Sequence, residues 1–308
     1  MIGKPVCFLV LTGCTVALAQ TKAVFIKDGQ IYKAEYPEYD STRLTNDAVA
    51  KRGPRWSPDG NKIVFLDDEW TKTSIGTLVV ITSGGSVVGR YPVATVQPDR
   101  TPISGMRAVD NIGWLDQMHI YAVGSVNPYI VEFRAIDINT RKLTGFGGSG
   151  FSTCTTGGTG GGTVAFWSAV FPPEKVMTLR MSSATTDLFE FPDTDKLPTL
   201  NIPLAWDGDC GAIAFVDPRP PLHLVVIGIH HRRAVVLLPE NMKETPAVFG
   251  TKNGFIIGIN GRLLFNRITG TLGSTPDSVL QEIVRNRALR EETETKLGGA
   301  EWDWWTAY

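Results

Sequence analysis

The chain has 308 residues, of which 43% are hydrophobic, so it can bury a full core. Its 30 basic and 31 acidic residues give a net charge of −1, which argues against nucleic-acid binding and against a polybasic membrane surface. Beyond the N-terminal segment, no stretch holds the ~18 consecutive apolar residues that a membrane-spanning helix needs.

Residues 1–19 are predicted to be a secretory signal peptide. Lys4 is followed by an apolar run from Val6 to Val16, and Ala17-Leu18-Ala19 forms an A-x-A cleavage pattern. We therefore expect cleavage after Ala19 and a periplasmic or secreted protein. The alternative is a lipobox that ends at Cys14 and makes this residue a lipid anchor, although the apolar core before it is short.

From Ala23 to about Gly270 the chain alternates short β-like runs with turn residues. Asp28-Gly29 separates two such runs, and Asn260-Gly261 separates 255–259 from 262–265. Both dipeptides favour tight hairpin turns, because their residues tolerate positive φ. Strands joined in this way are antiparallel neighbours, so the predicted fold class is all-β.

The segment from Trp56 to Phe65 combines a turn with a strand. Trp56 is a large apolar anchor, Ser57-Pro58-Asp59-Gly60 consists of turn formers, and Ile63-Val64-Phe65 has strand character. A second copy runs from Trp206 to Phe215 with the same nine-residue offset. One looser and two degenerate copies are predicted at residues 113–121, 171–176 and 249–255. In these copies Asp59, Asp116 and Asp209 are expected to accept hydrogen bonds from backbone N–H groups of the turn.

Together with the Arg43-Leu44-Thr45-Asn46-Asp47 segment upstream, these copies resemble the blade repeat of the TolB-type periplasmic β-propellers, W-S-P-D-G-x-x-I-A-F. The resemblance implies a β-propeller of about six four-stranded blades over residues 20–273. A strand from the C-terminal region would complete the first blade and so protect its edge. An irregular β-sandwich is the alternative fold. The chain departs from the family pattern in its later blades, and it lacks the N-terminal α/β domain of TolB.

The resemblance also implies a non-enzymatic role, in which the central channel and its loops bind a protein partner or a small ligand. Two polar clusters are candidate binding residues: Asp67, Asp68, Glu69, Trp70, His230, His231, Arg232 and Arg233. Carboxylates beside an indole can hold a sugar or a cation, and arginine forks suit carboxylates and phosphates. A solvated loop and an exposed hairpin tip are the simpler interpretations. An extracellular carbohydrate-active enzyme, a lyase or a glycosidase, is the alternative function.

Cys154 and Cys210 are the two cysteines outside the signal segment, and we expect them to form a disulfide. Free thiols or a metal site are the alternatives. The chain has four histidines and none of the spacings typical of metal centres, so no metal and no cofactor is predicted. The glycine-rich segment 155–163 lacks the lysine of a phosphate-binding loop, and no catalytic residues are predicted.

Residues 274–308 differ in kind from the rest of the chain. A surface helix is predicted over 278–296, with Thr275 as N-cap and Gly298-Gly299 as its end. Its first turns carry the apolar face that would dock it, namely Leu280, Ile283, Val284 and Arg287. Beyond the helix, Trp302, Trp304 and Trp305 are expected to close the propeller or to cover one mouth. An exposed partner-binding segment is the alternative.

Overall fold

The structure is a computed structural model that describes residues 21–306, except for short gaps. The gaps are residues 68–75, 97–101, 107, 128–129, 156–161, 171–175, 182–186, 192, 195–196, 198–200, 230–232, 241, 243, 253 and 259–260. The predicted signal peptide, the lipobox cysteine Cys14 and the degenerate repeat that begins at Phe171 therefore lie wholly or mostly outside the described residues.

The first sheet joins the two ends of the described chain. Its strand order is β25-β1-β2-β3. The strands are β25 (Ala300–Thr306), β1 (Thr21–Lys27), β2 (Gln30–Glu35) and β3 (Thr42–Arg43). As predicted, a C-terminal strand pairs with the first N-terminal strand, antiparallel, with Trp304 opposite Ala23. The tryptophan-rich tail is therefore the first strand of this sheet.

The remaining sheets are also antiparallel. The second contains β4 (Lys51–Trp56), β5 (Lys62–Asp67), β6 (Thr77–Thr82) and β7 (Val87–Pro92). A small pair follows, β8 (Ala94–Val96) and β9 (Pro102–Gly105). Two four-stranded sheets come last: β17 (Ala205–Trp206), β18 (Ala212–Asp217), β19 (His223–Gly228), β20 (Arg233–Leu237), and β21 (Val248–Thr251), β22 (Gly254–Ile257), β23 (Leu263–Asn266), β24 (Thr271–Ser274).

Between β9 and β17 the chain forms a seven-stranded sheet, in which one long strand pairs with one neighbour along its first half and with the other along its second half. Its members are β10 (Ala108–Trp114), β11 (His119–Asn127), β12 (Ile130–Asp137), β13 (Leu143–Cys154), β14 (Thr163–Val170), β15 (Val176–Met181) and β16 (Phe189–Phe191). The first half of β13 pairs with β12, and its second half pairs with β14. The strand thus ends one four-strand unit and begins the next.

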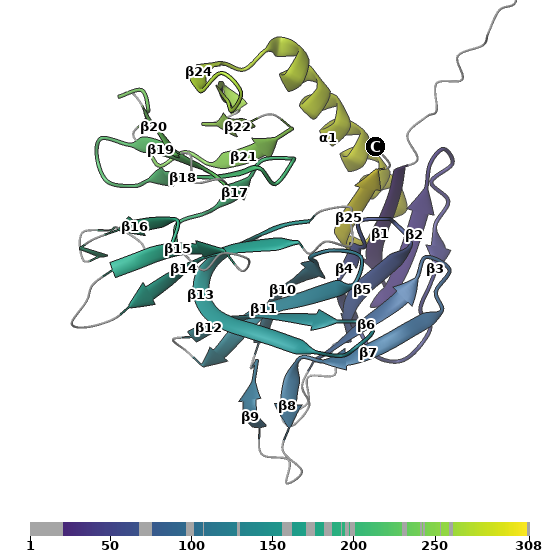
Figure 1. Ribbon diagram of the computed structural model, residues 1–308. Helices are drawn as coiled ribbons and strands as arrows, with labels where there is room; N and C mark the ends of the chain where they lie inside the picture. Colours follow the sequence, from purple (N-terminus) through teal and green to yellow (C-terminus); the bar gives the residue numbers. More distant parts are fainter. Residues whose placement is uncertain are drawn as a thin grey trace, which may run out of the picture.

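The core lies between successive sheets. On β5, Ile63 and Phe65 pack with Val24 of the preceding sheet, whereas Val64 and Leu66 pack toward Trp114 of the following one. Alternate residues of a strand face opposite sides, so an all-apolar strand is buried on both faces. Figure 1 shows the sheets following one another in chain order, with helix α1 (Asp277–Leu297) running from β24 back to β25.

The structure confirms that the three predicted repeats that begin at or beside a tryptophan are equivalent. Trp56 lies opposite Ile63, Trp114 opposite Ile120 and Trp206 opposite Ile213, and the three indoles are 6%, 3% and 7% exposed. The copy predicted at 249–255 has the same register, because Phe249 lies opposite Ile256. It differs in burial, since Phe249 is 60% exposed and is not a buried anchor like the three tryptophans.

The turn after each tryptophan is held by a carboxylate, but the prediction is wrong about one of them. Asp59 accepts the backbone N–H of Asn61 and Asp116 accepts that of Met118. In the third copy the acceptor is Asp207, which binds the Gly211 N–H at 2.7 Å. The same Asp207 oxygen also accepts the Ala212 N–H at 3.2 Å, so one carboxylate holds both amides. Asp209 instead forms an ion pair with Arg267.

One of the two predicted hairpins is confirmed. Asp28 and Gly29 both have positive φ, 51° and 68°, and they join β1 to β2. The second is wrong in its length, because β22 ends at Ile257 opposite Leu263, so five residues separate the strands. Gly258, with a φ of 98°, ends the strand before the predicted Asn260-Gly261 turn. Asn260 lies outside the described residues.

Helix α1 begins and docks differently from the prediction. Its cap residue is Pro276, without a side-chain cap hydrogen bond, so Thr275 is not the N-cap. Ile283 and Val284 are 47% and 65% exposed, so the predicted apolar face is not its main docking surface. The buried residue of the helix is Thr293, in the charged distal half. This half docks on Trp304 of β25, because Glu294 accepts the indole N–H and Arg290 lies over the ring. Gly298 ends the helix as predicted, with a φ of 66° and its N–H on the Glu294 carbonyl.

The predicted disulfide is confirmed. Cys154, the last residue of β13, bonds Cys210 in the turn after β17, with 5.7 Å between their Cα atoms. The bond therefore ties the seven-stranded sheet to the β17–β20 sheet.

Candidate functional site

Of the eight binding residues predicted from the sequence, the structure describes two, and they lie on different sheets. Asp67 ends β5, is 2% exposed, and forms ion pairs with Lys51 Nζ at 2.6 Å and Arg90 Nη1 at 2.5 Å. Arg233 begins β20, and its guanidinium lies 4.4 Å from the ring centroid of Phe189. Asp68, Glu69 and Trp70, and His230, His231 and Arg232, lie outside the described residues.

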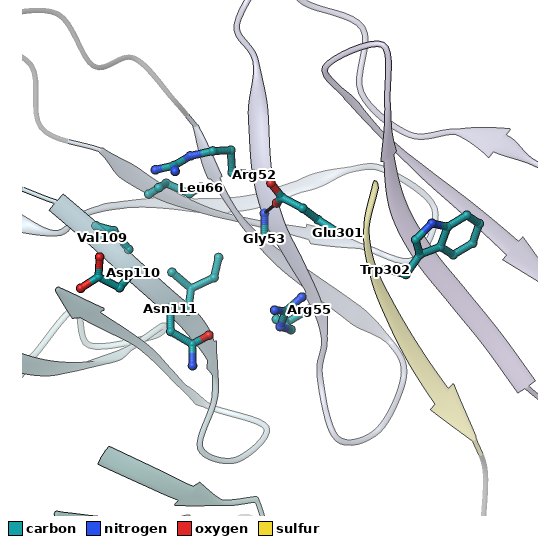
Figure 2. A pocket seen from close by; sticks show the side chains of 10 residues that line it. Arg52, Gly53, Arg55, Leu66, Val109, Asp110, Asn111, Glu301 and Trp302 are labelled. Atoms are coloured by element: carbon teal, nitrogen blue, oxygen red, sulfur yellow. Dashed lines mark hydrogen bonds between the residues drawn. The ribbon is translucent and has the colours of Figure 1, made fainter. Parts of the chain in front are cut away.

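Two adjoining cavities lie elsewhere, along the first strands of three sheets, β25, β4 and β10. The first, here called the charged cavity, has a volume of about 230 Å³ and is lined by Arg52, Arg55, Asp110, Asn111 and Glu301, among others. Figure 2 shows these side chains, with Arg52 and Arg55 from β4, Asp110 and Asn111 from β10, and Glu301 from β25.

The second, here called the aromatic cavity, has a volume of about 250 Å³ and shares Arg55 with the first. Its walls are mainly aromatic, and its lining includes Trp56, Trp114, Tyr121, Trp304, Trp305, Thr155 and Asp303. The two cavities thus follow the same strands from Arg52 to Pro58. In a propeller the first strand of each blade faces the central channel.

Irregular pairing shapes the first strands beside the charged cavity. β4 loses register between Arg52 and Arg55, and β25 does so opposite Phe25. The residues with positive φ at these two bulges are Gly53 (57°) and Glu301 (53°), each three positions before a tryptophan. Bulges redirect side chains and are common next to functional sites. The residue of β4 that is equivalent to Glu301 is a glycine, Gly53. A positive φ costs free energy in residues other than glycine, and Glu301 bears this cost.

Two carboxylates of β25 join it to β4. Glu301 Oε2 accepts the backbone N–H of Gly53, drawn as a dashed line in Figure 2. Asp303 Oδ2 accepts the backbone N–H of Trp56 at 2.7 Å. Burial raises the pKa of the Asp303 carboxyl above its usual value, against the opposing effects of the Trp56 N–H and the Arg55 and Arg290 charges.

Tyr121 contributes a hydroxyl group to the aromatic cavity. It lies opposite Gly113, where a Cβ would come within 2.7 Å of the Tyr121 hydroxyl oxygen, so the glycine leaves space for this side chain. Burial raises the pKa of the Tyr121 phenol. The hydroxyl therefore keeps its proton at neutral pH and can donate a hydrogen bond.

Helix α1 contributes to the wall of the aromatic cavity through Trp304. Glu294 of α1 accepts the indole N–H of Trp304 at 2.8 Å, and the Arg290 guanidinium lies 5.6 Å from the ring centroid. Trp114 and Trp206 instead donate to the first strand of the preceding unit, to the carbonyls of Arg55 and Ser152. Glu294 therefore takes the place that a preceding strand occupies in the other repeats.

Sequence reasoning named the tail tryptophans Trp302, Trp304 and Trp305, which line the two cavities, as a cover for one mouth or a partner-binding segment. It missed the polar residues that line both cavities. The sequence did contain a signal for two of them. Arg55 directly precedes Trp56 and Asp303 directly precedes Trp304, so a charged residue occupies the same position in both repeats. Within the described residues, no group of three or more His, Cys, Asp and Glu side chains is placed to hold a metal ion. No described helix is long and apolar enough to span a membrane.

No protein-family model and no curated protein sequence matches the chain. Solved structures do. Dipeptidyl peptidase 4 of Porphyromonas gingivalis matches with a TM-score of 0.51 at 11% identity, over 85% of this chain and 44% of that one. A prolyl endopeptidase also matches with a TM-score of 0.51, at 10% identity, over 72% of this chain and 35% of that one.

The fold is a β-propeller. The successive antiparallel sheets and these two matches carry that conclusion. TolB of Acinetobacter baumannii matches as well, at 12% identity over 82% of this chain and 62% of TolB. Its TM-score of 0.38 is too low to support the fold assignment. At these identities the likeness shows the fold alone, and the chain spans less than two thirds of each of these proteins.

Proposed function

We propose that this chain is an exported β-propeller that binds a protein partner or a small ligand on the first strands β25, β4 and β10. The observation that carries the proposal is the pair of adjoining cavities there, which share Arg55 and receive charged side chains from all three strands. Binding pockets are typically concave, with apolar walls and a few convergent polar groups. The aromatic cavity has this character.

The propeller of this proposal has six four-stranded units. The support for this count is that β13 pairs on both sides and so belongs to two units, while β25 completes the first unit from the far end of the chain. Helix α1 then bridges the last unit and the first (Figure 1).

Export is supported by the disulfide between Cys154 and Cys210, because such bonds persist in oxidising compartments. We expect the mature protein, recovered from the producing cell, to begin at Gln20. N-terminal sequencing and intact mass measure this directly. A mature chain that begins with an acylated Cys14 would favour the lipoprotein alternative.

Site-specific photo-crosslinking tests the location of the binding site. A photoreactive residue replaces Asn111, which lines the charged cavity, and in a control chain it replaces Ile268, which is 74% exposed and outside both cavities. We expect a specific crosslinked product from position 111 and none from position 268. Crosslinks of equal yield at both positions would contradict the proposal.

The two predicted clusters remain part of the proposal as additional recognition loops. Asp67 is engaged by Lys51 and Arg90, so its contribution would be indirect, through these ion pairs, while Asp68, Glu69 and Trp70 would contact the ligand. His230, His231, Arg232 and Arg233 would contact an anionic partner. Their replacement by alanine should weaken partner binding without lowering the unfolding temperature.

The proposal assigns binding, and not turnover, to these cavities. Its support is that both carboxylates of β25 are engaged by backbone N–H groups of β4. Polysaccharide cleavage that disappears in both Glu301→Gln and Asp303→Asn would overturn it in favour of a carbohydrate-active enzyme.

A further inference from the structure

The aromatic cavity contains a cation, Arg55, that forms no close ion pair with a described carboxylate, although its charge acts on the Asp303 carboxyl of the same lining. Arg55 Nη1 donates to the carbonyl of its neighbour Pro54 at 2.9 Å, and among the described residues Arg55 forms no ion pair. A guanidinium has five N–H donors, and one such bond leaves the fork largely open. An open arginine fork is suited to the two oxygens of a carboxylate.

The same cavity contains a buried donor without an acceptor. Of the four tryptophans that line it, Trp114, Trp304 and Trp305 donate their indole N–H groups to Arg55 O, Glu294 Oε1 and Pro58 O. Trp56 is 6% exposed, and its Nε1 has no hydrogen-bond partner among the described residues. A buried N–H left in this state costs about 1–3 kcal/mol, a cost that a bound acceptor removes.

The carboxylate acceptor in the cavity lining is partly engaged. Asp303 Oδ2 takes the backbone N–H of Trp56. The hydroxyl of Thr155 donates to the Trp114 carbonyl at 3.0 Å. The Tyr121 hydroxyl is 3.4 Å from Thr153 Oγ1, a long contact that leaves it available as a further donor.

Two more cations lie against the aromatic walls. Lys22 Nζ lies 5.0 Å from the Trp305 ring centroid and 5.8 Å from that of Trp56, and Arg290 lies over Trp304. With Arg55 they make three cations around the aromatic walls, against two carboxylates, Asp303 in the lining and Glu294 on the Trp304 indole. The cavity therefore has an excess of hydrogen-bond donors and of positive charge.

We infer that the aromatic cavity binds the carboxylate of a small organic anion with a flat apolar body. The Arg55 guanidinium and the Trp56 indole N–H hold the carboxylate, and the body lies against the rings of Trp114 and Trp305. The inference rests on the proposed function and names the ligand class of its site. A carboxylate is favoured over a phosphate because it is planar and because the aromatic walls suit an anion attached to an apolar group.

Benzoate is the probe, benzamide is its neutral counterpart of the same shape, and inorganic phosphate is the tetrahedral anion. The mature chain, labelled with ¹⁵N at the tryptophan indoles, is titrated with each and followed by NMR. We expect benzoate to shift one indole resonance downfield, and we expect this resonance to be the one missing from the spectrum of Trp56→Phe. Benzamide and phosphate should leave it in place.

Three variants test the assigned residues. Arg55→Gln should raise the dissociation constant for benzoate about 10-fold or more, because a charge-assisted hydrogen bond is lost. Trp56→Phe keeps the ring and loses only the N–H, so it should also raise the constant about 10-fold. Trp206→Phe is the matched control, because Trp206 has the equivalent register but donates to Ser152 and lines neither cavity. It should leave benzoate binding unchanged.

The inference is overturned if benzamide binds as tightly as benzoate, if phosphate alone moves the Trp56 resonance, or if benzoate binds Arg55→Gln unchanged. If Trp56→Phe does not fold, the inference is still decided by the benzoate affinity of Arg55→Gln and by competition among the three probes. These outcomes are separate from the crosslinking test. Crosslinks at position 111 without benzoate binding would remove only the ligand class, whereas benzoate binding without crosslinks would remove the partner-binding role.

Discussion

Glu301 adopts positive φ at a bulge where the equivalent residue of β4 is Gly53, and it accepts the Gly53 N–H. Glycine adopts this conformation without the Cβ penalty, whereas Ala retains the penalty and loses the hydrogen bond. We therefore expect Glu301→Gly to be more stable than Glu301→Ala by about 1 kcal/mol in urea unfolding. Equal stabilities, or a more stable alanine variant, would show that the backbone at this position is unstrained.

Asp303 gives a pH-dependent prediction. Burial raises the pKa of the Asp303 carboxyl in the folded state above 3.8. The protonated carboxyl therefore stabilises the fold at pH values below 3.8, and this stabilisation is lost as the pH rises through the folded-state pKa. Asp303→Asn does not titrate. The unfolding free energy of the variant minus that of the parent chain should therefore increase as pH rises from about 3 to 7.

The difference between the two chains is the quantity to measure, because the carboxyls of Asp47, Asp59 and Asp137, whose pKa values are lowered, titrate in both and cancel. Urea unfolding at a series of pH values provides it. A difference that is flat, or that grows toward acid pH, would contradict the raised pKa of Asp303.

At the scale of elements, α1 is attached mainly through its distal half. The side chain of Val284 is 65% exposed, so Val284→Ala should change the unfolding free energy by less than about 0.5 kcal/mol. Trp304→Ala removes the contacts with Glu294 and Arg290 and the stacking on Trp302, and should cost about 2 kcal/mol or more. Similar costs for the two substitutions, measured by chemical unfolding, would mean that the helix docks by its apolar face.

Much of the element pattern could be predicted from the sequence because it is local. The register of Trp56 and Trp206 follows from their turns, and the β1–β2 hairpin follows from Asp28-Gly29. The Asp207 acceptor and the longer β22–β23 loop were missed, since neighbouring turn formers compete for the same role. The polar cavity residues were missed because bulges in separate strands bring them together, and the pattern of a single strand does not show which first strands are neighbours.

At the scale of the whole molecule, the disulfide joins two sheets through a separation of 56 residues. Closing a loop of this length restricts the unfolded chain by roughly 4 kcal/mol in the chain-entropy estimate. The double variant Cys154→Ser with Cys210→Ser should lose about that much unfolding free energy, measured in urea without reductant. A loss below about 1 kcal/mol would mean that the bond adds little to the sheet packing.

The central claim is that recognition takes place on the first strands β25, β4 and β10, through Arg55. The most direct measurement is the affinity of the partner crosslinked at position 111 for the mature chain and for Arg55→Gln. The control is Arg287→Gln on α1, whose side chain is 79% exposed. The account predicts about a 10-fold weaker complex for Arg55→Gln and no change for the control. Equal affinities for the mature chain and Arg55→Gln would contradict it.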